Sequence, residues 1–570
     1  MSFDLVIRSG TVVDGTGAPA RTADVAITDG RVVEVGSVAD RGHREIDADG
    51  AVVAPGFVDI HTHYDGQATW DERLQPSSSH GVTTVVSGNC GVGFAPVRAD
   101  DHELLVELME GVEDLPGAVL HEGLSWEWES IADYLDALDR RRYDIDLAAQ
   151  VCHGPVRVYV MGQRGADREP ASVEEIAAMG RVAAEGIRAG ALGFTTSRTL
   201  NHRTSRGEPT PTLTAAREEL VGIARAIGAT GRGVLQVVSD FTDSAVEEET
   251  LLEMMRASGR PLSISLLQAA PGLGYRARLD LLDAAHAEGL TMRAQVAARA
   301  VGILLGLQGS INPLSRTPSF QAVAELPLAE QTRLLSEPAR REQLVNEVRN
   351  KRLPFPLERI FELGDPPQYE PMPDDSIAAR AQRAGVDTHD FYVDLLLADG
   401  GRALLYLPFL NYFDGNLDAA AEMIAHRHTV PGLSDGGAHV GTICDASFPT
   451  SLLTLWGRDR AAGTTFDLPF LIQRQSRATA EAVGLLDRGL LAPGYKADVN
   501  VIDFDNLTLT PPVMVHDLPA GGKRLIQGAR GYLHTVVSGV ETYADGQPTG
   551  ALPGRFIRGE QPGPRLEASR

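Results

Sequence analysis

The central part of this chain alternates short apolar segments, each long enough for one strand, with longer segments of helical periodicity. Strands separated by helices in this way pair in parallel, and eight of them close a barrel. The alternation predicts an α/β fold, with a (β/α)8 TIM-like barrel over residues 57–487. An apolar segment at 404–410 is an alternative to the last strand. The eight candidate strands lie at 56–61, 83–88, 145–151, 191–197, 233–238, 262–267, 290–296 and 429–435.

The two ends of the chain have a different pattern of apolar and turn-forming residues. Residues 1–56 and 488–560 contain short alternating apolar runs closed by Gly or Asp-Gly, which is typical of β-hairpins. We expect both ends to build one small β-sandwich. Residues from about 305 to 400 are rich in Pro, Arg and Glu, and we expect a helical insertion over the barrel mouth. Residues 561–570 are expected to be a tail.

Composition excludes several classes of partner. The chain has 570 residues and a net charge of −25, so nucleic acid and anionic membranes are not expected to bind it. It shows no apolar run of membrane-spanning length and no signal-peptide pattern. An odd number of cysteines, three, argues against a disulfide framework. We therefore expect a cytoplasmic protein that acts on a small molecule; a homo-oligomer is left open.

The strongest local motif is Asp59-Ile60-His61-Thr62-His63, directly after the first predicted strand. Side chains two residues apart on a strand share a face, so both histidines are expected to point into the barrel. Two imidazoles held in this way form half of a divalent-metal site. Two hydrogen-bonded pocket histidines are the alternative, but the place at the end of a barrel strand favours a metal.

Two motifs carry a resemblance to a known family. The segment APGFVDIHTHYDGQ resembles the first metal motif of the amidohydrolase superfamily, and GVTTVVSGNCGVGFAP resembles its D-aminoacylase branch, the N-acyl-D-amino-acid deacylases. The resemblance implies that Cys90 takes the place of the carboxylated lysine that bridges metals in many relatives. Lys351, Lys496 and Lys523 all lie away from the predicted strand ends, and a thiolate is a good zinc ligand.

The resemblance extends to the end of the barrel. In GLSDGGAHVGT, Asp435 matches the family's aspartate, which contacts the metal-bound water and shuttles its proton. GLLAPGYKADVNVIDFD resembles the family's return to the β-sandwich. The ligand set implied is His61, His63, Cys90 and Asp435, with Asp435 also catalytic. The cofactor implied is a divalent metal, with Zn²⁺ preferred; one ion is favoured, and two remain an alternative.

The chain departs from the family at two ligands. Relatives hold the more tightly bound metal with histidines at the ends of the fifth and sixth strands, where this chain has Val238 and Leu266. Gln236, Asp240 and Gln268 lie nearby on the same strands and are candidates for partial replacement. The departures put a two-metal centre in doubt, and with it a direct transfer of substrate specificity.

Other polar residues at predicted strand ends are candidates for contacts with substrate. His153 is a candidate catalytic residue, as an oxyanion or substrate contact or a substitute ligand, and a structural hydrogen bond is its alternative role. His202, Arg293 and His439 are candidates for substrate binding, since an arginine suits a carboxylate. The function expected is hydrolysis of an amide C–N bond, of an N-acyl-D-amino acid for example, by metal-activated water. Hydrolysis of a cyclic amide or imide, and a non-catalytic metabolite-binding barrel, are the alternatives.

Overall fold

A computed structural model describes residues 2–272, 274–351, 353 and 355–564, and eight segments of these form a closed parallel barrel. The pairing order is β6-β7-β8 on one side and β9-β10-β11-β12-β13-β17 on the other, and Gln150 alone separates β8 from β9. A parallel bridge between Thr62 and Gly436 closes the ring between β6 and β17. The strands are β6 (Phe57–Asp59), β7 (Val82–Ser87), β8 (Asp146–Ala149) with β9 (Val151–Cys152), β10 (Gly193–Arg198), β11 (Val234–Ser239), β12 (Leu262–Leu266), β13 (Met292–Val296) and β17 (Thr429–Pro431).

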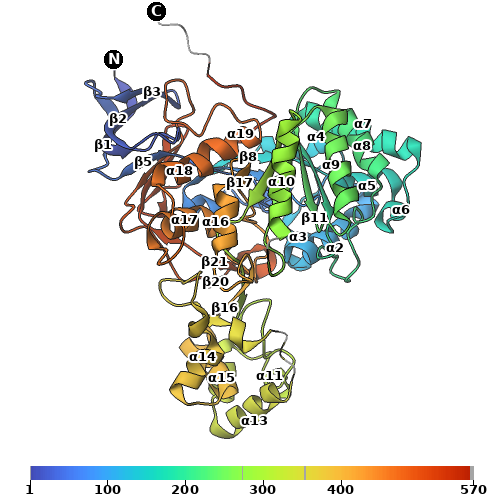
Figure 1. The fold of residues 1–570 in the computed structure, drawn as a ribbon, viewed down its shortest axis with the longest axis vertical. Coiled ribbons are helices and arrows are strands. Elements are labelled where there is room, and N and C mark those ends of the chain that lie inside the picture. Colours follow the sequence, from blue (N-terminus) through green and yellow to red (C-terminus); the bar gives the residue numbers. More distant parts are fainter. Residues whose placement is uncertain (1, 273, 352, 354, 565–570) are drawn as a thin grey trace, which may run out of the picture.

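The predicted fold class and the eighth strand are confirmed. The alternative segment forms β16 (Leu405–Leu410), which pairs antiparallel with β14 (Val301–Leu305) outside the barrel. Helices lie outside the barrel strands in Figure 1, among them α7 (Val173–Ala189), α8 (Arg217–Gly228) and α9 (Ser244–Ser258).

Local sequence sets the limits of these helices, as α7 shows. Ser172 and Glu175 form a capping box at its start, and Gly190 ends it with a φ of 118°. Met179, Ala183 and Ile187 recur every four residues on its buried face. The buried face joins the main hydrophobic core, which also contains apolar residues of the barrel strands such as Leu235, Val237 and Ile264.

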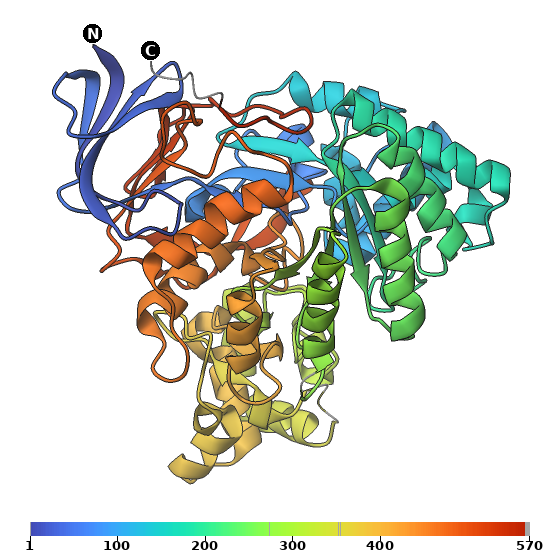
Figure 2. The same ribbon diagram turned by 45° about the horizontal axis from the view of Figure 1, so that its top comes forward.

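Strands from both chain ends form one sheet beside the barrel. Its order is β25-β24-β23-β18-β5-β1-β2-β3, with β4 on β1. The two ends meet where β5 (Val52–Pro55) pairs antiparallel with β18 (Val499–Ile502), and Figure 2 shows the N-terminal strands against the C-terminal ones. The remaining strands are β1 (Phe3–Val12), β2 (Arg21–Thr28), β3 (Arg31–Gly36), β4 (Gly42–Asp47), β23 (Tyr532–Val537), β24 (Val540–Ala544) and β25 (Gln547–Pro548).

The insertion between β14 and β16 forms a helical lobe with its own hydrophobic core. The lobe projects from the barrel in Figures 1 and 2. Near its base, Ser310 donates a hydrogen bond to Asp114, which belongs to the barrel side. The lobe helices are α11 (Pro318–Gln321), α12 (Leu328–Leu335), α13 (Pro338–Arg349), α14 (Ile377–Ala384) and α15 (Thr388–Gly401).

The expected tail is described only as far as residue 564. Gln561 pairs with Leu485, so the first part of this segment lies against the barrel side of the molecule. Residues 565–570 lie outside the described residues. Among the helices that the structure describes, none has the length and apolar character needed to cross a membrane.

Candidate metal centre

The backbone fixes His61 and His63 on one face of an extended segment after β6. His63 N–H donates to Gly436 O at 2.7 Å, and Thr62 N–H donates to Val86 O on the other side. The segment therefore continues the β6 strand between its two neighbours. Residues two apart on such a segment point the same way, and both imidazoles are 1% exposed.

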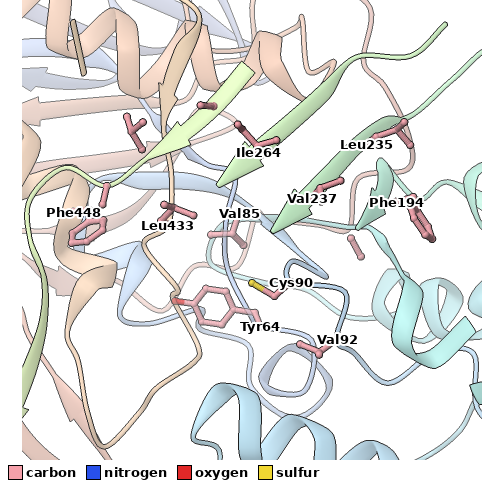
Figure 3. Close-up of a cluster of buried hydrophobic side chains, with 14 of the residues drawn as sticks. Tyr64, Val85, Cys90, Val92, Phe194, Leu235, Val237, Ile264, Leu433 and Phe448 are labelled. Carbon is pink, nitrogen blue, oxygen red and sulfur yellow. The ribbon is translucent and has the colours of Figure 1, made fainter. Parts of the chain in front are cut away.

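Cys90 lies in a tight turn after β7. Its φ is 56°, and Gly91 follows with a φ of 68°. A Cβ on Gly91 would lie 2.9 Å from the Cα of Thr196, so this position needs glycine for space as well as for conformation. The turn holds the thiol beside His61, with 3.4 Å between Sγ and Nε2. Figure 3 draws Cys90 among barrel residues that include Val85, Val237 and Ile264.

Asp435 is presented by a second strained turn, after β17. Its φ is 50°, and Gly437 has a φ of 91° in a place where a Cβ would meet His63 O at 2.9 Å. Gly437 is therefore required by the geometry of the turn. The effect of the turn is to bring Oδ1 of Asp435 to 3.4 Å from Nε2 of His61 and 3.6 Å from Nε2 of His63.

The arrangement suits a divalent cation. Ligand atoms of His61, His63 and Cys90 all lie within 4.8 Å of one another. Both ring nitrogens of His63 are buried without a hydrogen-bond partner among the described residues, and such orphaned groups are costly unless something else satisfies them. Two imidazoles, a thiolate and a carboxylate are ligands that Zn²⁺ accepts in a tetrahedral site. The residues present therefore fit the group that the sequence implies.

The outer ring nitrogens of the two histidines face polar side chains. Nδ1 of His61 lies 2.6 Å from Oε1 of Gln295 on β13. Nδ1 of His63 lies 3.3 Å from Oε1 of Glu113, near the end of α2 (His102–Glu113). The other oxygen of Glu113 lies 3.6 Å from Nε2 of His439. Each acceptor favours a proton on Nδ1, which leaves Nε2 free to bind a metal.

Burial shapes the protonation of the centre. It lowers the pKa of His63 to about 4 and also lowers that of His61, so both rings are neutral at pH 7. Burial alone would raise the pKa of Asp435, but the adjacent imidazoles of His63 and His61 bring that pKa well below its ordinary value. The carboxylate of Asp435 is 19% exposed, so an ionised proton acceptor faces solvent beside two neutral imidazoles.

Among the candidates for replacement ligands, Asp240, Gln268 and the amide nitrogen of Gln236 bond elsewhere, whereas Oε1 of Gln236 is buried without a partner among the described residues. Asp240 accepts hydrogen bonds from Thr199 Oγ1 and Leu200 N–H. Gln268 donates to Asp414, and Gln236 donates to Ser265. None of these contacts involves the metal-centre residues.

At the two family positions themselves, Val238 packs against the main core and Leu266 is 3% exposed within it. The ends of β11 and β12 thus carry apolar side chains at the two positions expected to depart from the family.

The structure does not bring His153 or Arg293 to this centre. His153 is fully buried at the start of α5 (His153–Met161), where Nδ1 lies 2.8 Å from Thr196 Oγ1 and Nε2 lies 2.9 Å from Glu219 Oε1. Both ring nitrogens are therefore satisfied internally. Arg293 is the second residue of β13, near the end of the strand opposite the metal centre, and it lines a small cavity with Gln150 and Ser263.

His202 and His439 do lie near the centre. Burial lowers the pKa of His202 to about 3, and the charges of His439 and His63 add to this effect. Nδ1 of His202 lies 2.8 Å from Ser197 Oγ at the end of β10. His439 follows the Asp435 turn, with its side chain 31% exposed. Their places beside a partly open carboxylate are consistent with contacts to substrate.

Sequence reasoning missed Glu113 and Gln295. A weak signal existed for Glu113, since it follows Met109 by four residues and therefore lies on the apolar face of α2. Gln295 is a polar residue within a barrel strand, where neighbouring Ala294 and Val296 are buried. No motif distinguishes either from an ordinary surface residue.

Comparison with known proteins identifies the family. The model described as Amidohydrolase family matches residues 44–361 and 374–548. This chain belongs to the amidohydrolase family. Among its relatives are two proteins of Alcaligenes xylosoxydans xylosoxydans. D-aminoacylase is 33% identical over 293 residues, 50% of this chain and 55% of the relative. N-acyl-D-glutamate deacylase is 34% identical over 255 residues, 43% of this chain and 46% of the relative.

These matches span about half the length of each relative, whereas structural similarity of this amidohydrolase extends over nearly the whole chain. The crystal structure of N-acyl-D-glutamate deacylase from Bordetella bronchiseptica, in complex with zinc and a phosphonate inhibitor, has a TM-score of 0.65 at 25% identity. The match covers 98% of this chain and 100% of that one. The resemblance to the D-aminoacylase branch is thereby confirmed.

Proposed function

We propose that this amidohydrolase is a metal-dependent hydrolase of an amide C–N bond, with N-acyl-D-amino acids as its substrate class. The observation that carries the proposal is the convergence of His61, His63, Cys90 and Asp435 from three separate segments of the chain. The named activities of the D-aminoacylase and N-acyl-D-glutamate deacylase relatives support the substrate class.

The four side chains divide the chemistry between holding a cation and moving a proton. A divalent metal held by His61, His63, Cys90 and Asp435 would lower the pKa of water to about 7 and polarise a substrate carbonyl. Oδ1 of Asp435 accepts a proton from the attacking water molecule, because its carboxyl group is ionised and partly open to solvent. The same atom then returns the proton to the amide nitrogen as the C–N bond breaks. The products are a carboxylic acid and an amine.

We propose a centre with one metal ion, preferably Zn²⁺. The ends of β11 and β12 provide Val238 and Leu266 at the two positions expected to depart from the family, and Asp240 and Gln268 nearby have other partners. His202 and His439, which lie near the metal centre, are proposed to contact the substrate.

Metal quantification together with a substrate panel tests the proposal. We expect about one zinc per wild-type chain, a large loss in Cys90→Ala, and hydrolysis of N-acyl-D-amino acids into two products. The panel includes cyclic amides and imides, where a single ring-opened product would favour the alternative chemistry. A protein that binds no metal and remains inert with added zinc, manganese or iron would contradict the proposed function.

A further inference from the structure

We propose that Glu113 is a positioning residue of the metal centre: its carboxylate holds the Nδ1 proton of His63 and so directs Nε2 of that ring toward the metal. The inference rests on the proposed function, since it concerns the same centre. It adds a side chain that no motif of the sequence marks.

Glu113 and Asp435 lie on opposite sides of the His63 ring. Oε1 of Glu113 lies 3.3 Å from Nδ1 of His63, and Oδ1 of Asp435 lies 3.6 Å from Nε2 of the same ring. The side chains of Glu113 and His63 are 2% and 1% exposed. Although this contact falls short of a formed hydrogen bond, Oε1 of Glu113 and both His63 nitrogens have no hydrogen-bond partner in the described part of the chain, so each group is available to the other.

A carboxylate in this place selects one tautomer of His63. A neutral imidazole carries one N–H and one lone pair. Burial raises the pKa of Glu113 well above its ordinary value, but a cation held at Nε2 of His63 would favour the ionised carboxylate, which can only accept. The proton therefore stays on Nδ1 and the lone pair on Nε2, beside Asp435. Hydrogen bonds of this kind fix the orientation of a ligand ring and raise its basicity. Gln295 makes the corresponding contact to His61, so both ligand histidines have an acceptor behind them.

The end of α2 is anchored so that Glu113 cannot easily turn away. Asp114, which follows with a φ of 51°, accepts hydrogen bonds from Ser310 at the base of the lobe and from Thr442 and Gly441 in the loop after Asp435. The backbone carbonyl of Glu113 also accepts from His439 N–H. These contacts hold the end of α2, and with it Glu113, against the turn that presents Asp435.

A purely structural role is the competing explanation, because Glu113 also lies 3.6 Å from Nε2 of His439. In that case its removal would lower stability and leave the metal centre unchanged. Zinc affinity and the absorption spectrum of the cobalt-substituted protein distinguish the two roles, since both report the ligand geometry. His439→Ala removes the second contact and keeps the first, so we expect its zinc affinity to match that of wild type.

The experiment titrates metal-free full-length protein with zinc against a competing chelator and records the cobalt spectrum. We expect Glu113→Ala to raise the zinc Kd by about 10- to 100-fold and Glu113→Gln by about tenfold, because the neutral amide oxygen is a weaker acceptor. The cobalt bands should shift in both variants. Asp144→Asn is the matched control: Asp144 is also buried, but it bonds to Leu74 N–H and Tyr543 OH.

The outcomes separate the two proposals. Wild-type zinc affinity and cobalt spectrum in Glu113→Gln, with or without a lower melting temperature, would overturn the positioning role. Glu113→Gln keeps the size of the side chain, so it decides the question even where Glu113→Ala does not fold. Failure of the wild-type protein to bind zinc or cobalt would instead contradict the proposed function itself.

Discussion

Oε1 of Gln295 lies 2.6 Å from Nδ1 of His61, a contact that joins β13 to the segment after β6. The amide oxygen can only accept, so it holds the proton on Nδ1 and leaves Nε2 facing Cys90 and Asp435. The Nε2 of the amide donates to Ser263 Oγ, which fixes the orientation of Gln295. One side chain thus connects two neighbouring barrel strands, β12 and β13, to a proposed ligand.

The contact predicts a loss of metal affinity in Gln295→Leu. We expect the zinc Kd to rise by about 10- to 100-fold, because the ring of His61 loses the acceptor that orients it. Isothermal titration with a competing chelator measures the change. Gln236→Leu is the matched control, since Gln236 is a buried barrel glutamine that donates to Ser265 and contacts no proposed ligand. Equal losses in both variants would show a general packing effect instead.

Asp435→Asn separates proton transfer from metal binding. We expect the variant to keep most of its zinc, since His61, His63 and Cys90 remain, but to lose nearly all turnover, because an amide cannot accept the proton of the attacking water. Metal content and kcat on the same preparation test this. Turnover close to that of wild type in a zinc-loaded variant would refute the assigned role.

Periodicity is sufficient to predict the barrel and to place His61 and His63 at the end of a strand, whereas the resemblance to the family is needed to mark Cys90 and Asp435 as ligands. His61 and His63 follow a strand, and Cys90 and Asp435 occur in glycine-bounded turns after other strands, so local pattern alone places them at one end of a parallel barrel. The positions of strands and turns are local information, because they require only that each segment adopt its own preferred structure.

The residues behind the ligands could not be predicted in this way. Glu113 reaches His63 across 50 positions of sequence, and Gln295 reaches His61 across 234. Both contacts depend on the way in which α2 and β13 pack, which no local pattern encodes. The expectation that Arg293 binds substrate fails for a related reason. The sequence places Arg293 on a barrel strand, but the strand's limits in the structure put it near the end opposite the metal centre.

His80 gives a prediction for the pH dependence of stability. It is fully buried, with Nδ1 2.9 Å from Thr450 Oγ1 and Nε2 2.9 Å from Gln527 O, and burial lowers its pKa to about 4. Between pH 6.5 and 4 the unfolded chain binds a proton at this site that the folded chain does not. Stability therefore falls as the pH drops through this window. From pH 7.5 to 5.5 His80 alone contributes a loss of about 1.3 kcal/mol.

His80→Gln should remove this contribution, because an amide can donate and accept at both contacts without titrating. Urea unfolding midpoints at pH 7.5 and 5.5 measure the effect, and we expect a smaller shift between the two pH values in the variant than in wild type. His43→Gln is the control, since His43 is exposed. An unchanged shift in His80→Gln would show that His80 is not a source of the acid sensitivity.

His153 tests whether a buried histidine near a strand end serves structure or reaction. Its ring bridges Thr196 and Glu219, and Glu219 is also paired with the buried Arg157. We expect His153→Leu to lower stability by about 1–3 kcal/mol through the loss of buried hydrogen bonds, while zinc content and kcat/KM stay close to wild type. Thermal unfolding, metal analysis and kinetics on one preparation decide the matter. If turnover collapsed while the melting temperature held, the ring would have to act on the substrate, and Glu219→Gln should then reproduce the kinetic loss.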